Sequence, residues 1–374
     1  MHGQSETATI IENKHCDVLV SCDLLVHCES AETKTQTSTG ASIVPMITNR
    51  SVRVALMVAT FGGIKPATAD EPVFTTAPQL VLESGAGEGP VWHPELGLLT
   101  SGDGNINRLN LKGETSVFRS EAGSNGLLFD RGGRLIVCEN RKRRITRTNA
   151  DGTVTILART YDGQKFNQPN DLTIDSQNRL YFSDPQYGDR SNMEMLDKNG
   201  THIEGVYRID PDGTVTRIIT HEVDRPNGLV ITPDDRYLFV ADNNNGVGGN
   251  RKLWRFDLNS DGTVNPRSRT LIHDWGTTRG PDGMKLDQLG RLYVAAGLNR
   301  PHLPQETATE PTAGIYVFDT DGKLLTFTPI TRDETTNCAF GGEDGKTLFV
   351  TAGGTLWKIR TSVPGVRMTG TLKP

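Results

Sequence analysis

A repeated unit of short strands begins near residue 74, and it restricts the possible folds more than any other feature. Alternating or apolar segments, typical of strands, are separated by Gly, Asp and Asn turns, and hardly any segment has the 3.6-residue period of a helix. Each unit runs as strand, polar turn, strand, loop, strand, Asp-Gly turn and strand. Four regular units begin near Gly126, Asp171, Gly228 and Gly283.

The Asp-Gly pairs predict the last hairpin turn of each regular unit, because both residues tolerate the positive φ that such turns require. These pairs begin at Asp151, Asp212, Asp261 and Asp321. Two less regular units follow Glu88 and Asn337. Six units of about four strands each predict an all-β fold, a six-bladed β-propeller. The last unit is short, so we expect residues 77–82 to supply its outer strand and close the ring.

One side chain that carries oxygen stands immediately before the first strand of each unit. In a propeller the first strands line the central channel, so these side chains should form a ring at one mouth of it. The alternative is that Asn and Asp before glycine only form turns that lead from loop to strand. The six residues are Glu88, Asn125, Asn170, Asn227, Asp282 and Asn337.

Such a ring suits a hard divalent cation, because the carboxylates of Glu88 and Asp282 together match its charge. Mixed amide and carboxylate oxygens favour calcium over zinc, which prefers His and Cys. Magnesium, manganese or zinc would be substitutes for calcium.

Several segments resemble, in order, the signature segments of the SMP-30/gluconolactonase/luciferin-regenerating family, in its bacterial gluconolactonase-like branch. They are GEGPVW, QPNDLTID, FSDPQYG, RPNGLVIT, GPDGM and TTNCAFGG, spread over about residues 77–360. The resemblance implies a six-bladed propeller with a catalytic divalent metal, usually calcium, held by Glu88, Asn170, Asn227 and Asp282. Asn125 and Asn337 match positions that are not usual ligands, so we expect them to lie behind the metal ligands and support them.

One position departs from the animal members of that family. There an arginine two places before the residue matching Asn170 helps to bind the substrate, whereas this chain has Gln168. The identity of the substrate is therefore left open by the resemblance.

A metal with an open coordination position can polarise a lactone carbonyl and orient the attacking water, so no covalent nucleophile is needed. The expected general base is Asp282, as the resemblance also implies. Because a cation lowers the pKa of a carboxylate that touches it, Asp282 could instead orient the water.

A sugar lactone also needs polar partners for its hydroxyls. The candidates are Asn170, Gln168, Asp171, Asp184 and Tyr187, and Tyr187 could equally be a packing residue. The long loop over residues 189–204 could cap the channel mouth or be an exposed excursion.

The expected function is hydrolysis of a sugar lactone, glucono-1,5-lactone or a related aldonolactone, as a carboxylic ester hydrolase of the gluconolactonase kind. Two alternatives stay open: a calcium-dependent esterase or phosphotriesterase on the same ring, and a non-catalytic ligand-binding propeller with a structural calcium. Forty basic and 45 acidic side chains leave a formal charge of −5, which disfavours nucleic acid and anionic lipid as partners and favours a small molecule.

The first 69 residues differ in composition from the rest. Residues 46–69 place Arg50 and Arg53 before an apolar run over residues 54–64 and a small-residue ending at Ala69, which is the layout of an export signal. We therefore expect a propeller over residues 70–374 in the periplasm or outside the cell, with no membrane association after cleavage. Residues 1–45 would be a disordered upstream extension without a folding role, or part of an unusually long leader. If residues 46–69 are instead an internal strand or helix, the protein is cytoplasmic. Cys138 and Cys338 are expected to be free buried thiols.

Overall fold

The structure is a computed structural model that describes residues 72–149, 151–308 and 312–366. The chain divides into two compact units, Met1–Lys65 and Pro66–Pro374, and every described residue belongs to the second. The extension and export signal expected over residues 1–69 lie outside the described residues.

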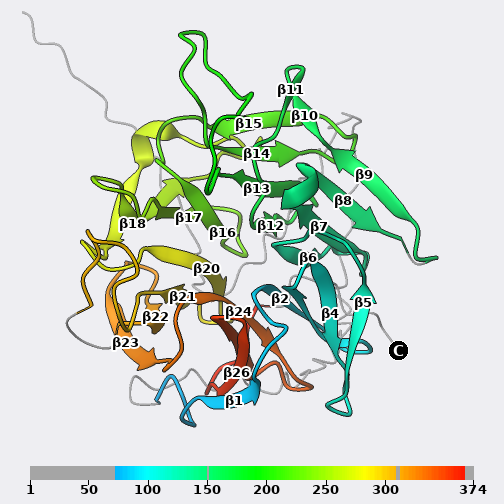
Figure 1. Cartoon of the computed structure of the whole chain (residues 1–374), viewed down its shortest axis with the longest axis vertical. Coiled ribbons are helices and arrows are strands. Elements are labelled where there is room, and N and C mark those ends of the chain that lie inside the picture. The colour runs from blue at the N-terminus through cyan, green and yellow to red at the C-terminus, as the bar shows by residue number, and fades with distance from the viewer. Residues whose placement is uncertain (1–71, 150, 309–311, 367–374) are drawn as a thin grey trace, which may run out of the picture. The chain divides into compact units, whose positions relative to one another are not determined.

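Six four-stranded antiparallel sheets stand around a common centre, as Figure 1 shows along the axis of the ring. The first sheet contains β2 (Glu88–His93), β3 (Gly97–Gly102), β4 (Asn105–Leu109) and β5 (Thr115–Arg119). The second contains β6 (Leu127–Phe129), β7 (Leu135–Glu139), β8 (Arg144–Thr148) and β9 (Val154–Ala158), with the 3₁₀ turn η1 (Asn140–Lys142). The third contains β12 (Leu172–Ile174), β13 (Leu180–Asp184), β14 (Gly205–Ile209) and β15 (Val215–Ile219).

The remaining three sheets repeat this order. The fourth contains β16 (Pro226–Ile231), β17 (Tyr237–Asn243), β18 (Arg251–Asp257) and β19 (Thr270–Asp274), with the 3₁₀ turn η2 (Pro266–Ser268). The fifth contains β20 (Pro281–Leu286), β21 (Leu292–Ala296), β22 (Gly314–Phe318) and β23 (Leu324–Pro329). The sixth contains β24 (Thr335–Gly341), β25 (Thr347–Ala352) and β26 (Thr355–Arg360). A small hairpin, β10 (Thr160–Tyr161) with β11 (Gln164–Lys165), stands between the second and third sheets in sequence.

The sixth sheet takes its fourth strand from the beginning of the described chain. Strand β1 (Gln79–Leu82) pairs antiparallel with β26, with Gln79 opposite Lys358 and Leu80 opposite Trp357. The prediction that residues 77–82 close the ring is confirmed, and so is the six-bladed propeller. The closure gives the sixth sheet four strands like the others. The outer edge of β26 is therefore paired with β1 instead of being left without a partner strand.

The core consists of six buried clusters, one between each pair of neighbouring sheets. Strand β7 shows how one strand serves two of them. Leu135 and Val137 belong to the cluster shared with the first sheet, and Ile136 and Cys138 to the cluster shared with the third. Because both faces of a blade are buried, its middle strands read as continuous apolar runs rather than as strict alternation.

The Asp-Gly turns form as predicted, but the physical reason differs from the prediction. Only the glycine of each pair has a positive φ, for example +82° at Gly152 and +80° at Gly262. In three of the four turns the aspartate contributes its side chain instead; Asp151 Oδ1, for example, accepts a hydrogen bond of 3.0 Å from the backbone N–H of Thr153. In the fourth turn Asp319 takes this role and accepts from the backbone N–H of Lys323 at 2.9 Å. This is a turn closed by a left-handed glycine, in which Asp is selected for hydrogen bonding rather than for its φ.

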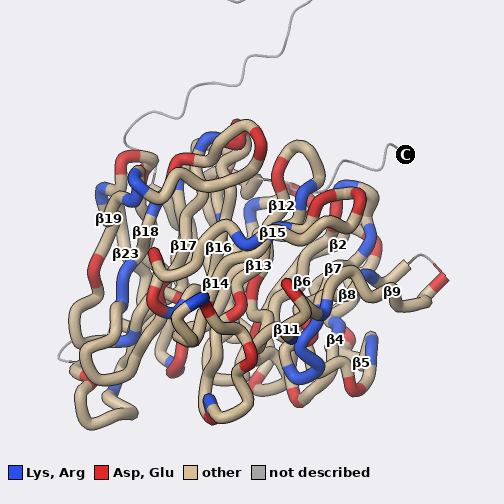
Figure 2. The backbone as a smooth tube through the Cα atoms, turned by 90° about the horizontal axis from the view of Figure 1, so that it is seen from above, with Lys and Arg blue, Asp and Glu red and all other residues tan. Residues whose placement is uncertain are grey.

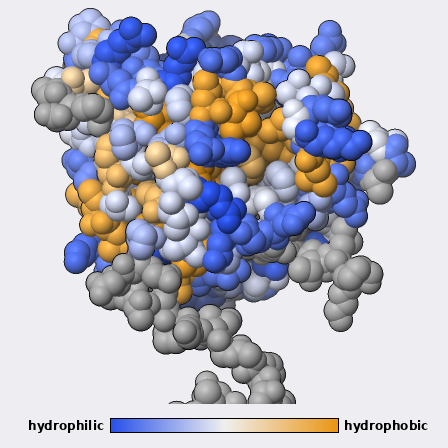
Figure 3. Space-filling model, turned by 90° about the horizontal axis from the view of Figure 1, so that it is seen from below, coloured by the Kyte–Doolittle hydropathy of each residue, from blue (hydrophilic) through white to orange (hydrophobic). Residues whose placement is uncertain are grey.

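Acidic and basic residues are interspersed along the loops and strands (Figure 2). On the face shown in Figure 3, apolar patches are framed by hydrophilic residues. Within residues 72–366, apart from the gaps at 150 and 309–311, no helix has the length and apolar character that crossing a membrane requires. Cys138 and Cys338 are free and buried, as expected.

Candidate metal and substrate site

The six residues predicted to form a ring occupy equivalent places on the six inner strands. Glu88 begins β2, Asn227 and Asp282 are the second residues of β16 and β20, Asn337 is the third of β24, and Asn125 lies two residues before β6. The sixth residue, Asn170, likewise lies two residues before β12. The inner strands contact one another in ring order, which places these residues around one channel (Figure 1).

Contacts across the channel show that the ring side chains converge. Asn337 Nδ2 donates to Glu88 Oε2 on the neighbouring first sheet at 3.3 Å. The same nitrogen donates to Asp171 Oδ2, on the opposite third sheet, also at 3.3 Å. The Asn337 amide on the sixth sheet therefore bonds side chains on both the first and the third sheets. At this level the channel is narrow enough for side chains from opposite sheets to touch.

A glycine after several ring residues lets the neighbouring blade approach. A Cβ built on Gly228, which follows Asn227, would lie 2.1 Å from the backbone oxygen of Asp282. On Gly283, which follows Asp282, it would lie 1.9 Å from Cγ of Asn337. Neither glycine has a positive φ. The turn explanation for the repeated Asn-Gly and Asp-Gly pairs at the ring is therefore insufficient here, because close approach of the next ring residue is what requires glycine.

Irregular pairing follows the ring residues in the inner strands. The register shifts between Glu88 and Val91 in β2, and between Pro281 and Met284 in β20. Similar shifts occur near Asn227 in β16 and near Asn337 in β24. Bulges of this kind re-aim a side chain, and here they occur where side chains must turn toward the channel.

The two ring carboxylates are buried close enough to interact electrostatically. The pKa of Glu88 is raised to about 7: burial is the main cause and the nearby Asp171 carboxylate adds to it, while the N–H of Gly89, the amide of Asn337 and the charge of Lys285 act in the opposite direction. Burial also raises the pKa of Asp282 well above its usual value, followed by the charges of Glu88 and Glu334. Both carboxyl groups are therefore harder to ionise than free ones. A divalent cation between them would favour their ionised forms and offset their mutual repulsion.

Three ring oxygens are buried without a hydrogen-bond partner: Asn125 Oδ1, Asn227 Oδ1 and Asp282 Oδ1. Buried acceptors in folded proteins are nearly always paired, so three in one ring call for an explanation. Amide and carboxylate oxygens are the ligands that calcium and magnesium take. Among the described residues no group of three or more His, Cys, Asp and Glu side chains is placed to hold a metal ion by itself, so a cation here would need amide oxygens as well as carboxylates. The residues present therefore fit a hard divalent cation.

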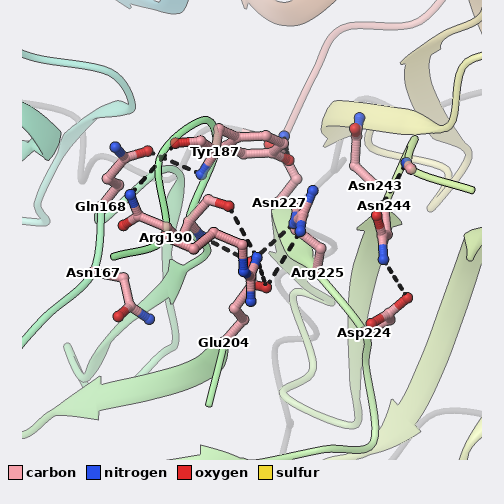
Figure 4. Close-up of polar contacts among 12 residues, drawn as sticks. Asn167, Gln168, Tyr187, Arg190, Glu204, Asp224, Arg225, Asn227, Asn243 and Asn244 are labelled. Carbon is pink, nitrogen blue, oxygen red and sulfur yellow. Dashed lines mark hydrogen bonds and ion pairs between the residues drawn. The ribbon is translucent and has the colours of Figure 1, made fainter. Parts of the chain in front are cut away.

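Tyr187 holds the amide of Asn227 in one orientation (Figure 4). The Asn227 Nδ2 donates to the Tyr187 hydroxyl at 2.9 Å, which leaves Oδ1 as the unpartnered atom. Burial raises the pKa of Tyr187 well above its usual value, followed by the charge of Asp282, so the hydroxyl stays protonated. The guanidinium of Arg225 lies 5.4 Å from the centroid of the Tyr187 ring and stacks over it.

A buried acid, Glu204, anchors this group. Its Oε2 accepts from Arg225 Nε at 2.9 Å and from the backbone N–H of Gln186 at 2.8 Å. Its Oε1 pairs with Arg190 at 2.5 Å (Figure 4). Sequence reasoning missed Arg225 and Glu204. A signal was present for Arg225, which stands two residues before Asn227 just as Gln168 stands two residues before Asn170.

The other predicted substrate contacts fall into two groups. Gln168 lies beside the ring, where its Oε1 accepts from the backbone N–H of Tyr187 at 3.1 Å, and Asp171 contacts Asn337. Asp184 is fully buried, and its Oδ2 accepts from the backbone N–H of Asn167 at 2.8 Å. Asp184 thus holds the loop that carries Gln168 and Asn170 rather than facing the channel through that oxygen.

The loop over residues 189–204 is not a wholly exposed excursion. Met193, Met195 and Ile203 are buried, and the last two belong to the cluster between the second and third sheets. Its C-terminal end delivers Glu204 to Arg225. That the loop caps the channel mouth stays a prediction.

Comparison with known proteins identifies the family. A family model described as the SMP-30/Gluconolactonase/LRE-like region matches residues 86–354, a range that includes all six ring residues. The chain belongs to the SMP-30/gluconolactonase/LRE-like family. The resemblance seen in the sequence is confirmed.

Members of the family with named activities are similar to this chain. The gluconolactonase of Zymomonas mobilis subsp. mobilis is 32% identical over 254 residues, which are 66% of this chain and 65% of that protein, just under two thirds of its length. A pentonolactonase of Haloferax volcanii is 28% identical over 280 residues, 72% of this chain and 81% of that protein. The structure of a gluconolactonase from Xanthomonas campestris superimposes with a TM-score of 0.63 at 29% identity, covering 77% of this chain and 89% of that one.

Proposed function

We propose that this family member is a divalent-cation-dependent hydrolase that opens a sugar lactone, glucono-1,5-lactone or a related aldonolactone. One observation carries the proposal: Asn125, Asn227 and Asp282 direct unpartnered buried oxygens into a ring that also holds Glu88. The activities named for the relatives, a gluconolactonase and a pentonolactonase, support a lactone as the substrate class.

Calcium is the cation that we propose, with Glu88, Asn170, Asn227 and Asp282 as the residues that would hold it. Asn337 fits a supporting role, because its Oδ1 accepts from the N–H of Cys338 at 2.8 Å and its Nδ2 is used by Glu88. When bound, the cation would polarise the lactone carbonyl and stabilise the oxyanion.

The chain's own residues position the reactants. Asp282 presents Oδ1 to the attacking water and accepts its proton as the water oxygen bonds to the carbonyl carbon. The ring C–O bond then breaks, and the leaving oxygen takes up the proton that Asp282 accepted, which gives the hydroxy acid and restores the Asp282 carboxylate. We propose that Asn170, Gln168 and Asp171 bind the sugar hydroxyls, while Tyr187 orients Asn227 and Asp184 fixes the loop of Gln168.

Hydrolysis of glucono-1,5-lactone with calcium, and with a chelator, tests the proposal. We expect activity that needs the cation and that falls at least about 100-fold in Asp282→Ala and in Glu88→Gln. Glu114→Gln is the matched control, since Glu114 is an exposed acid that bonds Asn110 on the first sheet, away from the ring.

The alternatives give different results in the same assays. A protein that binds calcium at the ring yet hydrolyses no lactone, aryl ester or phosphotriester would be a ligand-binding propeller. Cleavage of an aryl ester or phosphotriester without lactone hydrolysis would keep the cation site and replace the substrate class.

A further inference from the structure

A second hollow lies in the central channel, farther along the inner strands than the ring. It is a cavity of about 670 Å³ to which every inner strand contributes. In five of the six inner strands, the residue three positions after the ring residue lines the cavity. In β2, where the register shifts, the lining residue Trp92 stands four positions after Glu88. At about 3.3 Å per residue this separates the two sites by roughly 10 Å. One lining residue from each inner strand is Trp92, Leu128, Thr173, Val230, Lys285 and Phe340.

The walls of this cavity are mainly apolar, and among the residues that the structure describes Lys285 is the only Lys or Arg that lines it. Lys285 is half-buried, and the hydrogen bond described for its Nζ goes to the backbone oxygen of Met284 at 3.0 Å. An ammonium has three donor positions, so this bond leaves capacity for a ligand. The acids that line the cavity, Glu95 and Glu343, are exposed. The charge of Lys285 also reaches the ring, where it lowers the pKa of Glu88. The buried part of the cavity therefore carries one ammonium within apolar walls.

The last described residues bound one side of the cavity. Gly365 and Val366 line it, and they are tied to the fifth and sixth sheets by hydrogen bonds to Leu286 and Gly345. Val366 N donates to Leu286 O at 2.9 Å, and Gly365 N donates to Gly345 O at 3.0 Å. The hollow is thus enclosed on that side, and its volume falls within the range of small-molecule sites, about 300–1,000 Å³.

We propose that this cavity is a second ligand site, which binds an amphiphilic monocarboxylate. The carboxylate bonds the Lys285 ammonium, and the hydrocarbon part packs against Trp92, Leu128, Val230 and Phe340. No ring residue lines the cavity. The site therefore binds its ligand without the proposed cation and without the hydrolytic reaction.

A matched pair of probes, octanoate and 1-octanol, separates the charge from the hydrocarbon contribution. Binding is measured by calorimetry and by the change in intrinsic tryptophan fluorescence, to which Trp92 contributes. We expect octanoate to bind the full chain, and Lys285→Met to weaken it about 10-fold, the value of one charge-assisted hydrogen bond. The same variant should change 1-octanol affinity by less than about 2-fold.

A second variant tests the location independently of charge. Val230→Trp fills the cavity and should weaken both probes by at least about 10-fold. Leu271→Trp is its control, because Leu271 is exposed on the outer strand β19 of the same sheet. Circular dichroism and Tm of each variant show whether it folds.

Several outcomes would overturn the proposal. They are no octanoate binding, equal effects of Lys285→Met on both probes, binding that Val230→Trp leaves intact, and tighter binding of octylamine than of octanoate. Octanoate binding that is seen only after removal of residues 367–374 would show that the chain itself fills the cavity. Binding abolished by a chelator or by Glu88→Gln would place the ligand at the ring. Lactone hydrolysis is measured separately, so its failure leaves this test unaffected.

Discussion

Replacing Tyr187 by phenylalanine removes one hydroxyl, which in this structure orients the side-chain amide of Asn227. The hydroxyl accepts the Asn227 amide N–H at 2.9 Å, and Asn227 is only 3% exposed. Without it, a buried amide donor loses its partner, which costs about 1–3 kcal/mol. The amide can then rotate and present nitrogen where the ring needs oxygen.

The size of the effect on the cation follows from this loss. One kcal/mol is about a 5-fold change in affinity and 3 kcal/mol more than 100-fold, and loss of a residue that orients a metal ligand costs about 10–100-fold. We therefore expect the calcium Kd of Tyr187→Phe to rise about 10-fold or more, measured by calorimetry. The kcat for lactone hydrolysis should recover when calcium is saturating.

Tyr237→Phe is the matched control, because the Tyr237 hydroxyl accepts from Arg236 at 3.2 Å on the exposed surface. An unchanged calcium Kd in Tyr187→Phe would refute the orienting role. A raised KM at saturating calcium, with the calcium Kd unchanged, would instead support direct contact between Tyr187 and the substrate.

Three further predictions concern the ring and the chain terminus. The pKa of Glu88 rises from 4.5 to about 7, chiefly through burial, so this group stabilises the metal-free protein most below pH 4.5. That contribution, roughly 3 kcal/mol of unfolding free energy, should be lost as the pH rises through 7. Calorimetric Tm measured against pH with a chelator checks this, and a pH profile that Glu88→Gln does not flatten contradicts it. Gly283→Ala places a Cβ 1.9 Å from Asn337 Cγ and should lower both Tm and kcat/KM, whereas Gly246→Ala, whose Cβ would meet only the Oδ1 atom of the Asn244 side chain, at 3.1 Å, should change both values less. Mass spectrometry of the exported protein should find the chain starting after Ala69; a mature start at Met1 would contradict the export signal.

Much of this architecture could be predicted because the blades repeat. Six copies of one strand pattern fix the number of sheets, and the residue before each first strand then falls at one mouth of the channel. The role of Gly228 could not be predicted, since a glycine after Asn227 is as typical of a turn as of close approach. Glu204 was missed because its partner Arg225 lies on the next blade, 21 residues away, and no local pattern links them. Asp184 was predicted as a substrate contact, but it is the fully buried last residue of β13, where its Oδ2 accepts from the backbone N–H of Asn167 in the loop before Asn170.

The pairing of β1 with β26 has a consequence for how the protein matures. Glu88 and Asn337, which are 249 positions apart, come within 3.3 Å at the seam between the first and sixth sheets, beside that pairing. A growing polypeptide can complete its early blades, but it cannot bring these two side chains together until β24, the inner strand of the sixth sheet, has emerged. The support that Asn337 gives to Glu88 therefore comes late in synthesis, after the first five blades are in place.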